Sequence, residues 1–368
     1  MTIIAYATFG LIASSFTLYY IVSRVKAYWV LSKIPTHTFT GAADKQRYRE
    51  GLKELLRTGY SKYSKAGEVF KIHGTDSTFY RIVLPRDKLE EIKNASGRTF
   101  SWQLQSRRVL QIQYTGVPDR GPWSAKALRV DLHRHLDDLV REMNAIISAH
   151  LDERLAGDSV QWKSVNVLQL FQSCVARITN HAFCGPDLTN DPEWLEATMR
   201  FTADGFGAAA EVRRHPFYLR PFAALFLRSI KRVRSDKEMA KRKLGPLFRQ
   251  RKSARNNPEV KVPDDGFQRM LEAAPPNVSL EEFAGTMMRV MMASMHTTAH
   301  TATIAVGDLI SQPLYIAGLS QEMRESFGGK GIQIRECDQL RHLDSFLKES
   351  QRMTPLFLRK FSDYIYPR

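Results

Sequence analysis

The apolar pattern of the chain is strongest from Phe283 to Ile310, where Arg289 and Asp308 are the only charged residues. Ser279 stands three residues before Glu282, which is the spacing of a capping box at the start of a helix. A surface helix has one apolar stripe, whereas this stretch is apolar or small on nearly every side. The pattern therefore predicts a long helix buried in a large, mainly α-helical domain.

The middle of this helix is polar, with the run Ala293-Ser-Met-His-Thr-Thr298. Buried hydroxyls and imidazoles need hydrogen-bond partners or a chemical role, so the run is either satisfied core polarity or a site. His296 and His300 have the i, i+4 spacing of zinc-binding helices. However, no Glu follows His296, so the metalloprotease pattern fails and we expect no metal on this pair.

The flanking pattern predicts one small hairpin among many helices. Alternating residues predict strands over Val69–His73 and Phe79–Leu84. Helical spacing and glycine or proline stops predict helices over 48–60, 85–93, 131–155, 165–183, 201–207, 313–327 and 339–353. The fold class is therefore mainly α.

Two segments leave alternatives open. Pro216–Leu227 is rich in aromatic and aliphatic residues. It is either core or an exposed patch that needs a membrane or a substrate entrance. Arg228–Arg255 holds twelve Lys or Arg and two acids, within a chain whose net charge is +16. It is either an anion-binding patch or a solvated helix, and no nucleic-acid fold signature accompanies it, so we expect no nucleic-acid partner.

The N-terminus predicts a membrane anchor. Ile3–Val22 carries no charge and matches the thickness of a bilayer, and Tyr19-Tyr20 suits an interfacial belt. Basic residues follow it, which places the main domain in the cytosol. We therefore expect an anchor at 1–23, a basic, proline-containing hinge at 24–36 and one domain at 37–368. The three cysteines are too few for a disulfide framework, so the domain faces a reducing compartment.

Glu349 and Arg352 are spaced i, i+3 and share one helix face, so they can form an ion pair. Their neighbours Leu343, Phe346 and Leu347 are apolar, which indicates that the pair is buried. A buried ion pair is costly and is seldom retained without a role.

Together, the anchor, hinge, hairpin, Ala293-Ser-Met-His-Thr-Thr298 helix and Leu347-Lys-Glu-Ser-Gln-Arg352 motif resemble the cytochromes P450 in their fungal microsomal form. The resemblance covers essentially the whole chain. It implies a P450-like helical fold and a haem-thiolate monooxygenase that oxidises small apolar secondary metabolites of terpenoid type. It also implies haem, molecular oxygen, NADPH-cytochrome P450 reductase as electron donor, and a single-pass location in the endoplasmic reticulum membrane.

The resemblance assigns roles to named residues. Thr297 takes the position of the threonine whose hydroxyl passes protons during oxygen activation, and His296 replaces the neighbouring acid as a proton relay. Glu349 and Arg352 are structural and tie their helix to the haem-ligand loop. Trp123 has Ala127, not arginine, four residues on, so Arg129 and His133 are the candidates for the haem propionates.

The family's axial cysteine is absent, because no cysteine follows Cys337. We therefore expect a chain truncated before the haem-binding cysteine loop, with no metal ligand of its own. The alternative function is a haem-free, catalytically inactive remnant that acts as a membrane-bound binding protein. A membrane-tethered nucleic-acid binder, a third reading, would require the basic Arg228–Arg255 segment to bind polyanions.

Overall fold

The protein is seen here in a computed structural model. It describes residues 22, 25–26, 28–39, 45–73, 80–97, 99–131, 136–156, 162–254, 262–263, 265–328 and 332–356. The chain divides into two compact units, Met1–Ser101 and Trp102–Arg368. Each is described by itself, and the domain boundaries expected from the sequence stay a prediction.

The first unit holds the predicted hairpin. Strands β1 (Phe70–His73) and β2 (Tyr80–Val83) pair antiparallel, with Phe70 opposite Val83 and His73 opposite Tyr80, which confirms the prediction. Leu52, Leu55, Phe70 and Ile72 form its small core. The helical elements are α2 (Lys45–Lys62), η1 (Ser64–Ala66), η2 (Arg86–Lys88) and α3 (Leu89–Lys93).

The predicted stop of α2 near Gly59 is wrong, because the helix runs on to Lys62. A Cβ on Gly59 would lie 2.5 Å from the ring of Phe70. The glycine is therefore required for close packing of helix on strand, and not for ending the helix.

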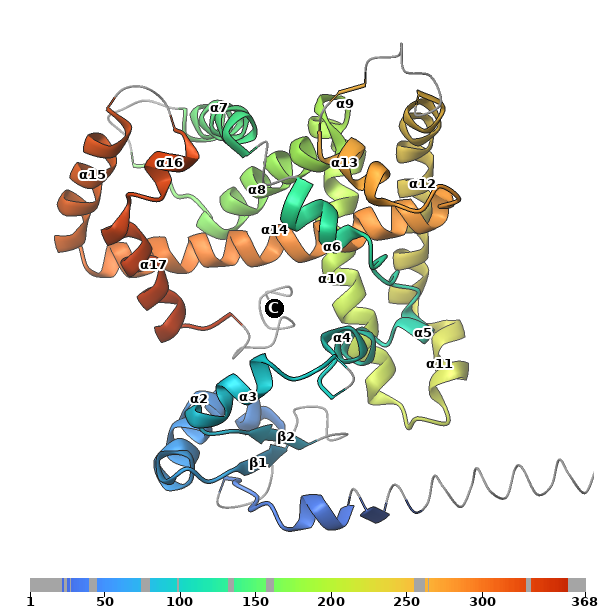
Figure 1. The fold of residues 1–368 in the computed structure, drawn as a ribbon, viewed down its shortest axis with the longest axis vertical. Coiled ribbons are helices and arrows are strands. Elements are labelled where there is room, and N and C mark those ends of the chain that lie inside the picture. Colours follow the sequence, from blue (N-terminus) through green and yellow to red (C-terminus); the bar gives the residue numbers. More distant parts are fainter. Residues whose placement is uncertain are drawn as a thin grey trace, which may run out of the picture. The chain divides into compact units, whose positions relative to one another are not determined.

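The regular elements in the described part of the second unit are all helices (Figure 1). Its elements are α4 (Trp102–Leu110), α5 (Ile112–Thr115), α6 (Ser124–Lys126), the π-turn η3 (Ala127–Asp131), α7 (Leu136–Leu155), α8 (Val167–Cys184), α9 (Pro186–Thr189), α10 (Pro192–Arg214), α11 (Arg220–Phe226), α12 (Arg228–Ala254), α13 (Gly266–Ala273), α14 (Leu280–Ser311), α15 (Leu314–Phe327), α16 (Ile334–Cys337) and α17 (Arg341–Met353). The mainly α fold class is confirmed.

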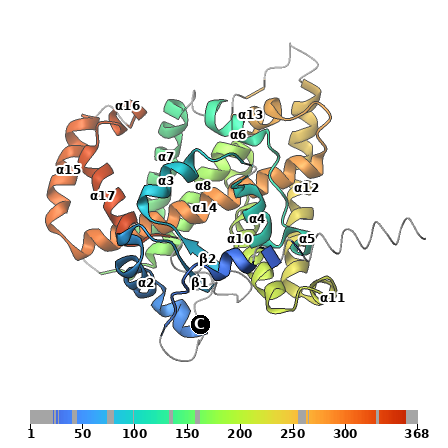
Figure 2. The ribbon, with the colours of Figure 1, turned by 60° about the horizontal axis from the view of Figure 1, so that its bottom comes forward.

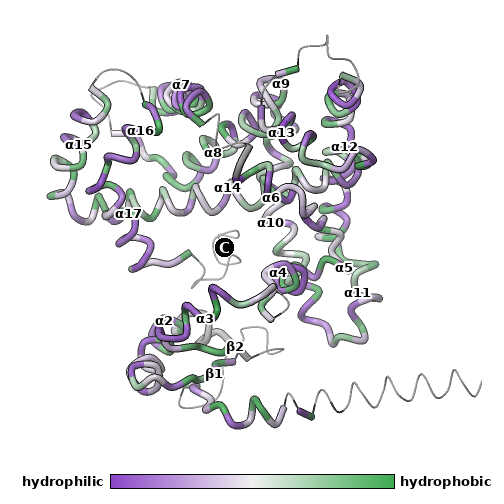
Figure 3. Tube along the Cα trace, in the orientation of Figure 1, coloured by the Kyte–Doolittle hydropathy of each residue, from purple (hydrophilic) through white to green (hydrophobic). Residues whose placement is uncertain are grey.

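The 32-residue helix α14 is the centre of this unit and packs against α8, α10, α12 and α17. The first turns of α14 carry the buried side chains of Phe283, Met287 and Met288, none of which is more than 1% exposed. Coloured by hydropathy, α12 is largely hydrophilic, in contrast to the mixed and apolar stretches of α14 (Figure 3). Burying a large apolar side chain contributes about 1.5–3 kcal/mol, so α14 and its neighbours form the main core.

Local sequence signals set the helix ends. The hydroxyl of Ser279 accepts a hydrogen bond from the backbone N–H of Glu282 at 3.1 Å, so Ser279 is the N-cap of α14, as the sequence predicted. Asp191 and Asp265 cap α10 and α13 in the same way. α15 ends at Gly328, whose φ of 49° is left-handed and favours glycine, as the sequence predicted.

The predicted membrane anchor at residues 1–23 lies almost entirely outside the described residues. Among the residues that the structure does describe, no helix is both long enough and apolar enough to span a bilayer. The anchor therefore stays a prediction. The C-terminal segment from residue 357 is likewise outside the described part.

Candidate functional site

One face of α14 is open at its middle. Ala293 and Thr298 are exposed, and Ser294 and Thr297 are partly buried, whereas Met291, Met292 and Met295 on the other side are core. The polar run found in the sequence therefore straddles the boundary between the core and an open helix face.

The hydroxyls of this face bond back to their own helix. Thr297 Oγ1 donates to the carbonyl of Ala293 at 2.8 Å, and Thr298 Oγ1 donates to Ser294 at 2.8 Å. Thr301 Oγ1 donates to Thr297 at 2.9 Å. Such bonds satisfy the hydroxyl protons and leave oxygen lone pairs free to accept hydrogen bonds from a group on the open side.

His296 lies on a different face from Thr297. It is 6% exposed, and its Nε2 is 3.0 Å from the carbonyl oxygen of Met199 on α10. Burial lowers the pKa of His296, so the ring is neutral near pH 7. A carbonyl only accepts hydrogen bonds, so Nε2 carries the proton and Nδ1, which has no partner among the described residues, is a bare acceptor.

The structure therefore does not bring the side chains of His296 and Thr297 together, because adjacent helical residues point about 100° apart. Burial also lowers the pKa of His300, one turn further on. Over the described ranges, no three His, Cys, Asp or Glu side chains gather as a metal-ligand set.

Glu349 and Arg352 form the expected pair on α17. Arg352 Nε donates to Glu349 Oε2 at 2.7 Å, and Arg352 Nη2 donates to Glu349 Oε1 at 2.5 Å. The hydrogen bond from Arg352 lowers the pKa of Glu349 and, in return, raises the pKa of Arg352.

The prediction that this pair is buried is wrong, since the two side chains are 60% and 67% exposed. Helical periodicity explains the error. Leu343, Phe346 and Ser350 line the less exposed face of α17, and Ser350 donates to Asp308 Oδ2 on α14 at 2.5 Å. Glu349 and Arg352 lie on the adjacent face.

Of the two residues predicted to bind a haem propionate, only Arg129 is among the described residues. Arg129 is exposed in the π-turn η3, and His133 lies outside the described residues. Trp123 Nε1, just upstream, donates to Glu282 Oε1 of α14 at 3.4 Å. These assignments stay predictions.

All three cysteines of the chain lie in helices, and none lies on the open face of α14. Cys174 and Cys184 are buried in α8, where Cys184 Sγ is 4.0 Å from Met291 Sδ. Cys337 is partly buried at the end of α16, an element that contacts α7 and α15. Burial raises the pKa of each thiol, which disfavours the thiolate form that binds iron.

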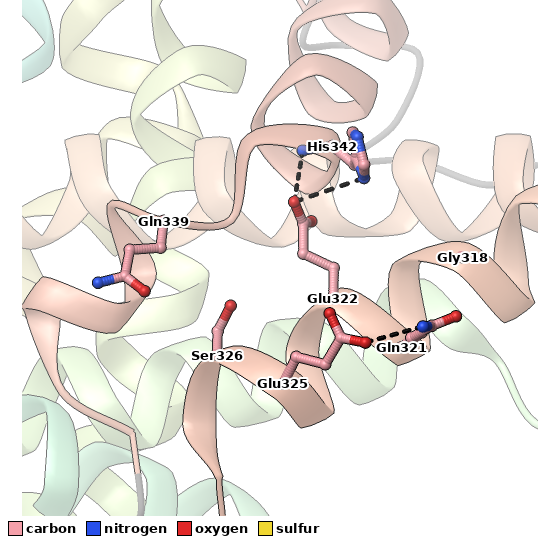
Figure 4. Close-up of a pocket in the computed structure, with 7 residues that line it drawn as sticks. All are labelled: Gly318, Gln321, Glu322, Glu325, Ser326, Gln339 and His342. Atoms are coloured by element: carbon pink, nitrogen blue, oxygen red, sulfur yellow. Dashed lines mark hydrogen bonds and ion pairs between the residues drawn. The ribbon is translucent and has the colours of Figure 1, made fainter.

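A separate groove of about 550 Å³ lies between α15 and α17 (Figure 4). Glu322 there accepts hydrogen bonds from the backbone N–H groups of His342 and Leu343, at 2.8 and 3.0 Å. Burial opposes these bonds, but together with the nearby His342 they hold the pKa of Glu322 below its usual value. The carboxylate therefore caps the N-terminus of α17 from a neighbouring helix.

The segment 216–227 is exposed, which decides between the two sequence alternatives. Phe217, Tyr218, Phe222, Leu225 and Phe226 are 74%, 61%, 65%, 61% and 79% exposed. α11 contacts α5 and α10, as Figure 2 shows from a second direction. The segment is a surface patch and not core.

The basic segment is a single helix, α12, whose charges are largely used within the fold. Arg232 reaches the buried Asp204 at 2.8 Å, and Lys243 reaches Asp191 at 2.5 Å. Further pairs join Lys237 and Lys241 to Glu281, Arg242 to Glu193, and Arg251 to Asp265. This arrangement favours the solvated-helix alternative over an anion-binding patch.

Arg289 is the only Lys or Arg in the apolar stretch from Phe283 to Ile310, and the sequence pattern assigns it no role. In the structure its guanidinium Nη2 donates to Ser106 Oγ of α4 at 2.5 Å. The signal was available in the sequence, since a cation on a buried helix is costly and calls for a partner.

Comparison with known proteins assigns the sequence of this chain to one family. The family model described as "Cytochrome P450" matches residues 85–361. Fungal relatives are the cytochrome P450 monooxygenases ccsG of Aspergillus clavatus (30% identical over 331 residues) and AN1598 of Emericella nidulans (28% identical over 322 residues). A third is the cytochrome P450 monooxygenase olcJ of Penicillium canescens, 28% identical over 317 residues.

These matches cover 89%, 86% and 84% of this chain but only 66%, 60% and 59% of the respective relatives. The chain thus spans about three fifths to two thirds of their length. The residues that the family model matches, 85–361, include α14 and α17.

Proposed function

Because the chain belongs to the cytochrome P450 family, we propose that it forms the substrate- and oxygen-facing side of a haem-dependent monooxygenase that oxidises a small apolar molecule. The observation that carries this proposal is the open, hydroxyl-bearing face of α14 around Thr297. A core helix has no packing reason to present three back-bonded threonines on one side. A polar reaction on that side provides the reason.

Thr297 is the residue assigned to proton handling. Its hydroxyl proton is held by the Ala293 carbonyl, so its oxygen accepts a hydrogen bond from a group on the open face. His296 points to Met199 on α10, away from Thr297, and burial keeps its ring neutral near pH 7, so its role as a proton relay comes from the family assignment alone. The role of Thr297 follows both the family assignment and the geometry of its side chain.

The haem ligand of the family does not fit the residues present. The iron needs a thiolate, and the three thiols lie in helices, two of them buried in α8, and not on the open face of α14. These three cysteines therefore do not fit the axial position, and no residue role proposed here runs through haem. Haem, oxygen and electrons from NADPH-cytochrome P450 reductase belong to the proposal as family requirements.

We also propose a membrane location at the endoplasmic reticulum, with the domain in the cytosol. The exposed aromatic patch at 216–227 supports it, because a patch of this kind favours contact with an apolar phase. The uncharged stretch Ile3–Val22 supports it from the sequence. A terpenoid-like secondary metabolite as the substrate class belongs to the proposal through the sequence resemblance to fungal cytochromes P450 alone.

A second candidate function is a haem-free binding protein without catalysis. One observation favours it, namely that all three cysteines lie in helices, with Cys174 and Cys184 buried in α8 and Cys337 at the end of α16, and none on the open face of α14. Such a protein would keep the open face of α14 as a binding surface.

The experiment that separates the two uses the protein purified from its native cells. Its mass, haem content and reduced carbon-monoxide difference spectrum are measured in one sample. The monooxygenase proposal requires bound haem and a thiolate-type Soret band in the species that carries this sequence, whatever its mass. A haem-free species would refute it and support the binding protein.

A further inference from the structure

Arg289 is a partly buried cation that does not bond directly to a carboxylate of the described residues. It makes one hydrogen bond, to Ser106 Oγ, and no ion pair with any of the described residues. Burial, together with repulsion from Arg120, lowers the pKa of its guanidinium, which nonetheless stays charged at neutral pH. A shielded charge of this kind destabilises the fold unless an anion compensates it.

The surroundings of Arg289 are positive. Asp119 is the nearby acid, but Arg107 Nε already binds its carboxylate at 3.0 Å. Arg120 adds a further positive charge. The single carboxylate of Asp119 does not neutralise the three arginines, so the region attracts an anion from solution.

Arg289 and Ser106 together offer a pair of donors. A guanidinium has five N–H groups in a fork that matches a carboxylate, and one is used here. The Ser106 hydroxyl accepts from Arg289 and keeps its own proton to donate. Two neighbouring donors of this kind suit the two oxygens of one carboxylate.

The position along α14 connects this pair to the proposed reaction face. Arg289, Ala293 and Thr297 are spaced i, i+4 and i+8, so each lies one turn after the last and about 40° further around the helix, and Thr297 is about 80° around from Arg289. Eight residues of helix rise about 12 Å. A molecule held at Arg289 therefore reaches Thr297 if its body extends over that length.

From this geometry we propose that Arg289 and Ser106 bind the carboxylate of an otherwise apolar, elongated substrate, and direct its far end to Thr297. The proposal rests on the proposed function in one respect, which is that the Thr297 face is where the substrate reacts. It narrows the substrate class from apolar molecules in general to amphiphilic acids with roughly 12 Å between the carboxylate and the oxidised carbon.

The test measures binding by isothermal titration calorimetry to the full chain, with no turnover involved. The probes are dodecanoate, dodecanol and dodecylammonium, which share an apolar chain and differ in the charge of the head group. We expect dodecanoate to bind at least about tenfold more tightly than dodecanol, as one charge-assisted hydrogen bond implies. Dodecylammonium should bind most weakly.

The variants locate the effect. R289Q should lower dodecanoate affinity about tenfold and leave dodecanol unchanged, while S106A should give a smaller loss in the same direction. R289K keeps the charge but loses the fork, and should fall between R289Q and the parent. The matched control is R249Q, which removes one exposed arginine from α12 and should have no effect.

Three results would overturn the inference: no dodecanoate binding to the parent chain, a preference for dodecanoate that survives in R289Q, or an equal loss in R249Q. Circular dichroism of each variant checks the fold, and R289K covers the case in which R289Q unfolds. The outcome is independent of the haem measurement. Failure at Arg289 leaves the monooxygenase proposal standing, and absence of haem leaves the binding result standing.

Discussion

The buried ion pair between Arg251 and Asp265 gives the sharpest test of how α12 uses its charge. Arg251 is 4% exposed and Asp265 is 16% exposed. Both guanidinium Nη groups donate to the two carboxylate oxygens, one of them at 2.7 Å, and the guanidinium lies over the ring of Phe267 at 5.1 Å. Asp265 also caps α13 by accepting from the backbone N–H of Gln268 at 2.9 Å.

The magnitude follows from what each substitution leaves behind. R251M leaves a largely buried carboxylate without its partner, which costs about 3–5 kcal/mol in the free energy of unfolding. D265N leaves the buried guanidinium unpaired and should cost a similar amount, although Asn still caps the helix. The double variant leaves no unpaired charge, so it should be more stable than either single variant.

The assay is urea unfolding followed by far-UV circular dichroism, with the four proteins of the cycle compared at one pH. R249M, an exposed arginine on the same helix, is the control and should change the free energy of unfolding by no more than about 0.5 kcal/mol. If the two single effects simply add in the double variant, the pair is not coupled and the reasoning about α12 is wrong.

Three further predictions concern single side chains. Burial lowers the pKa of His296, so stability should fall as the pH drops below 6.5, where the unfolded chain binds a proton that the folded chain refuses. H296Q should flatten this slope by up to about 1.4 kcal/mol per pH unit in urea titrations, and an unchanged slope would contradict the assignment. With a thiol reagent, Cys337 should react in the native protein and Cys184 only after unfolding, since Cys184 is 1% exposed. Equal rates would count against the burial of α8. Glu349→Ala should leave the melting temperature unchanged because the Glu349–Arg352 pair is exposed, and a marked fall would show that the pair is covered in solution.

Sequence patterns predicted the helices best where several signals coincide. α14 has an N-cap serine, a long span and few charged residues, and the structure has it from Leu280 to Ser311. Gly328 ends α15 in the left-handed region of φ, which glycine favours, so the helix end could be predicted from the sequence. Gly59 misled the prediction for α2, because a glycine required for packing against Phe70 looks the same as a glycine that ends a helix.

The candidate site was harder to predict from the sequence, because it depends on contacts between distant segments. The polar run on α14 could be found, but not that His296 faces Met199 while Thr297 faces the open side. The burial of Glu349 and Arg352 was misjudged because their apolar neighbours in the sequence, Leu343, Phe346 and Leu347, lie toward the less exposed side of the helix, whereas the ion pair lies on the adjacent, exposed side. The bond from Arg289 to Ser106 joins residues 183 positions apart, and no local pattern contains it.

The central proposal is that α14 is the oxygen-side helix of a P450 site and that none of Cys174, Cys184 and Cys337 supplies the thiolate for its iron. The most direct measurement is a carbon-monoxide difference spectrum of the reduced 368-residue chain, with total haem quantified in the same sample. The account predicts no Soret band of the thiolate type. A thiolate-type band that disappears when Cys174, Cys184 or Cys337 is replaced by serine would contradict it and identify the ligand.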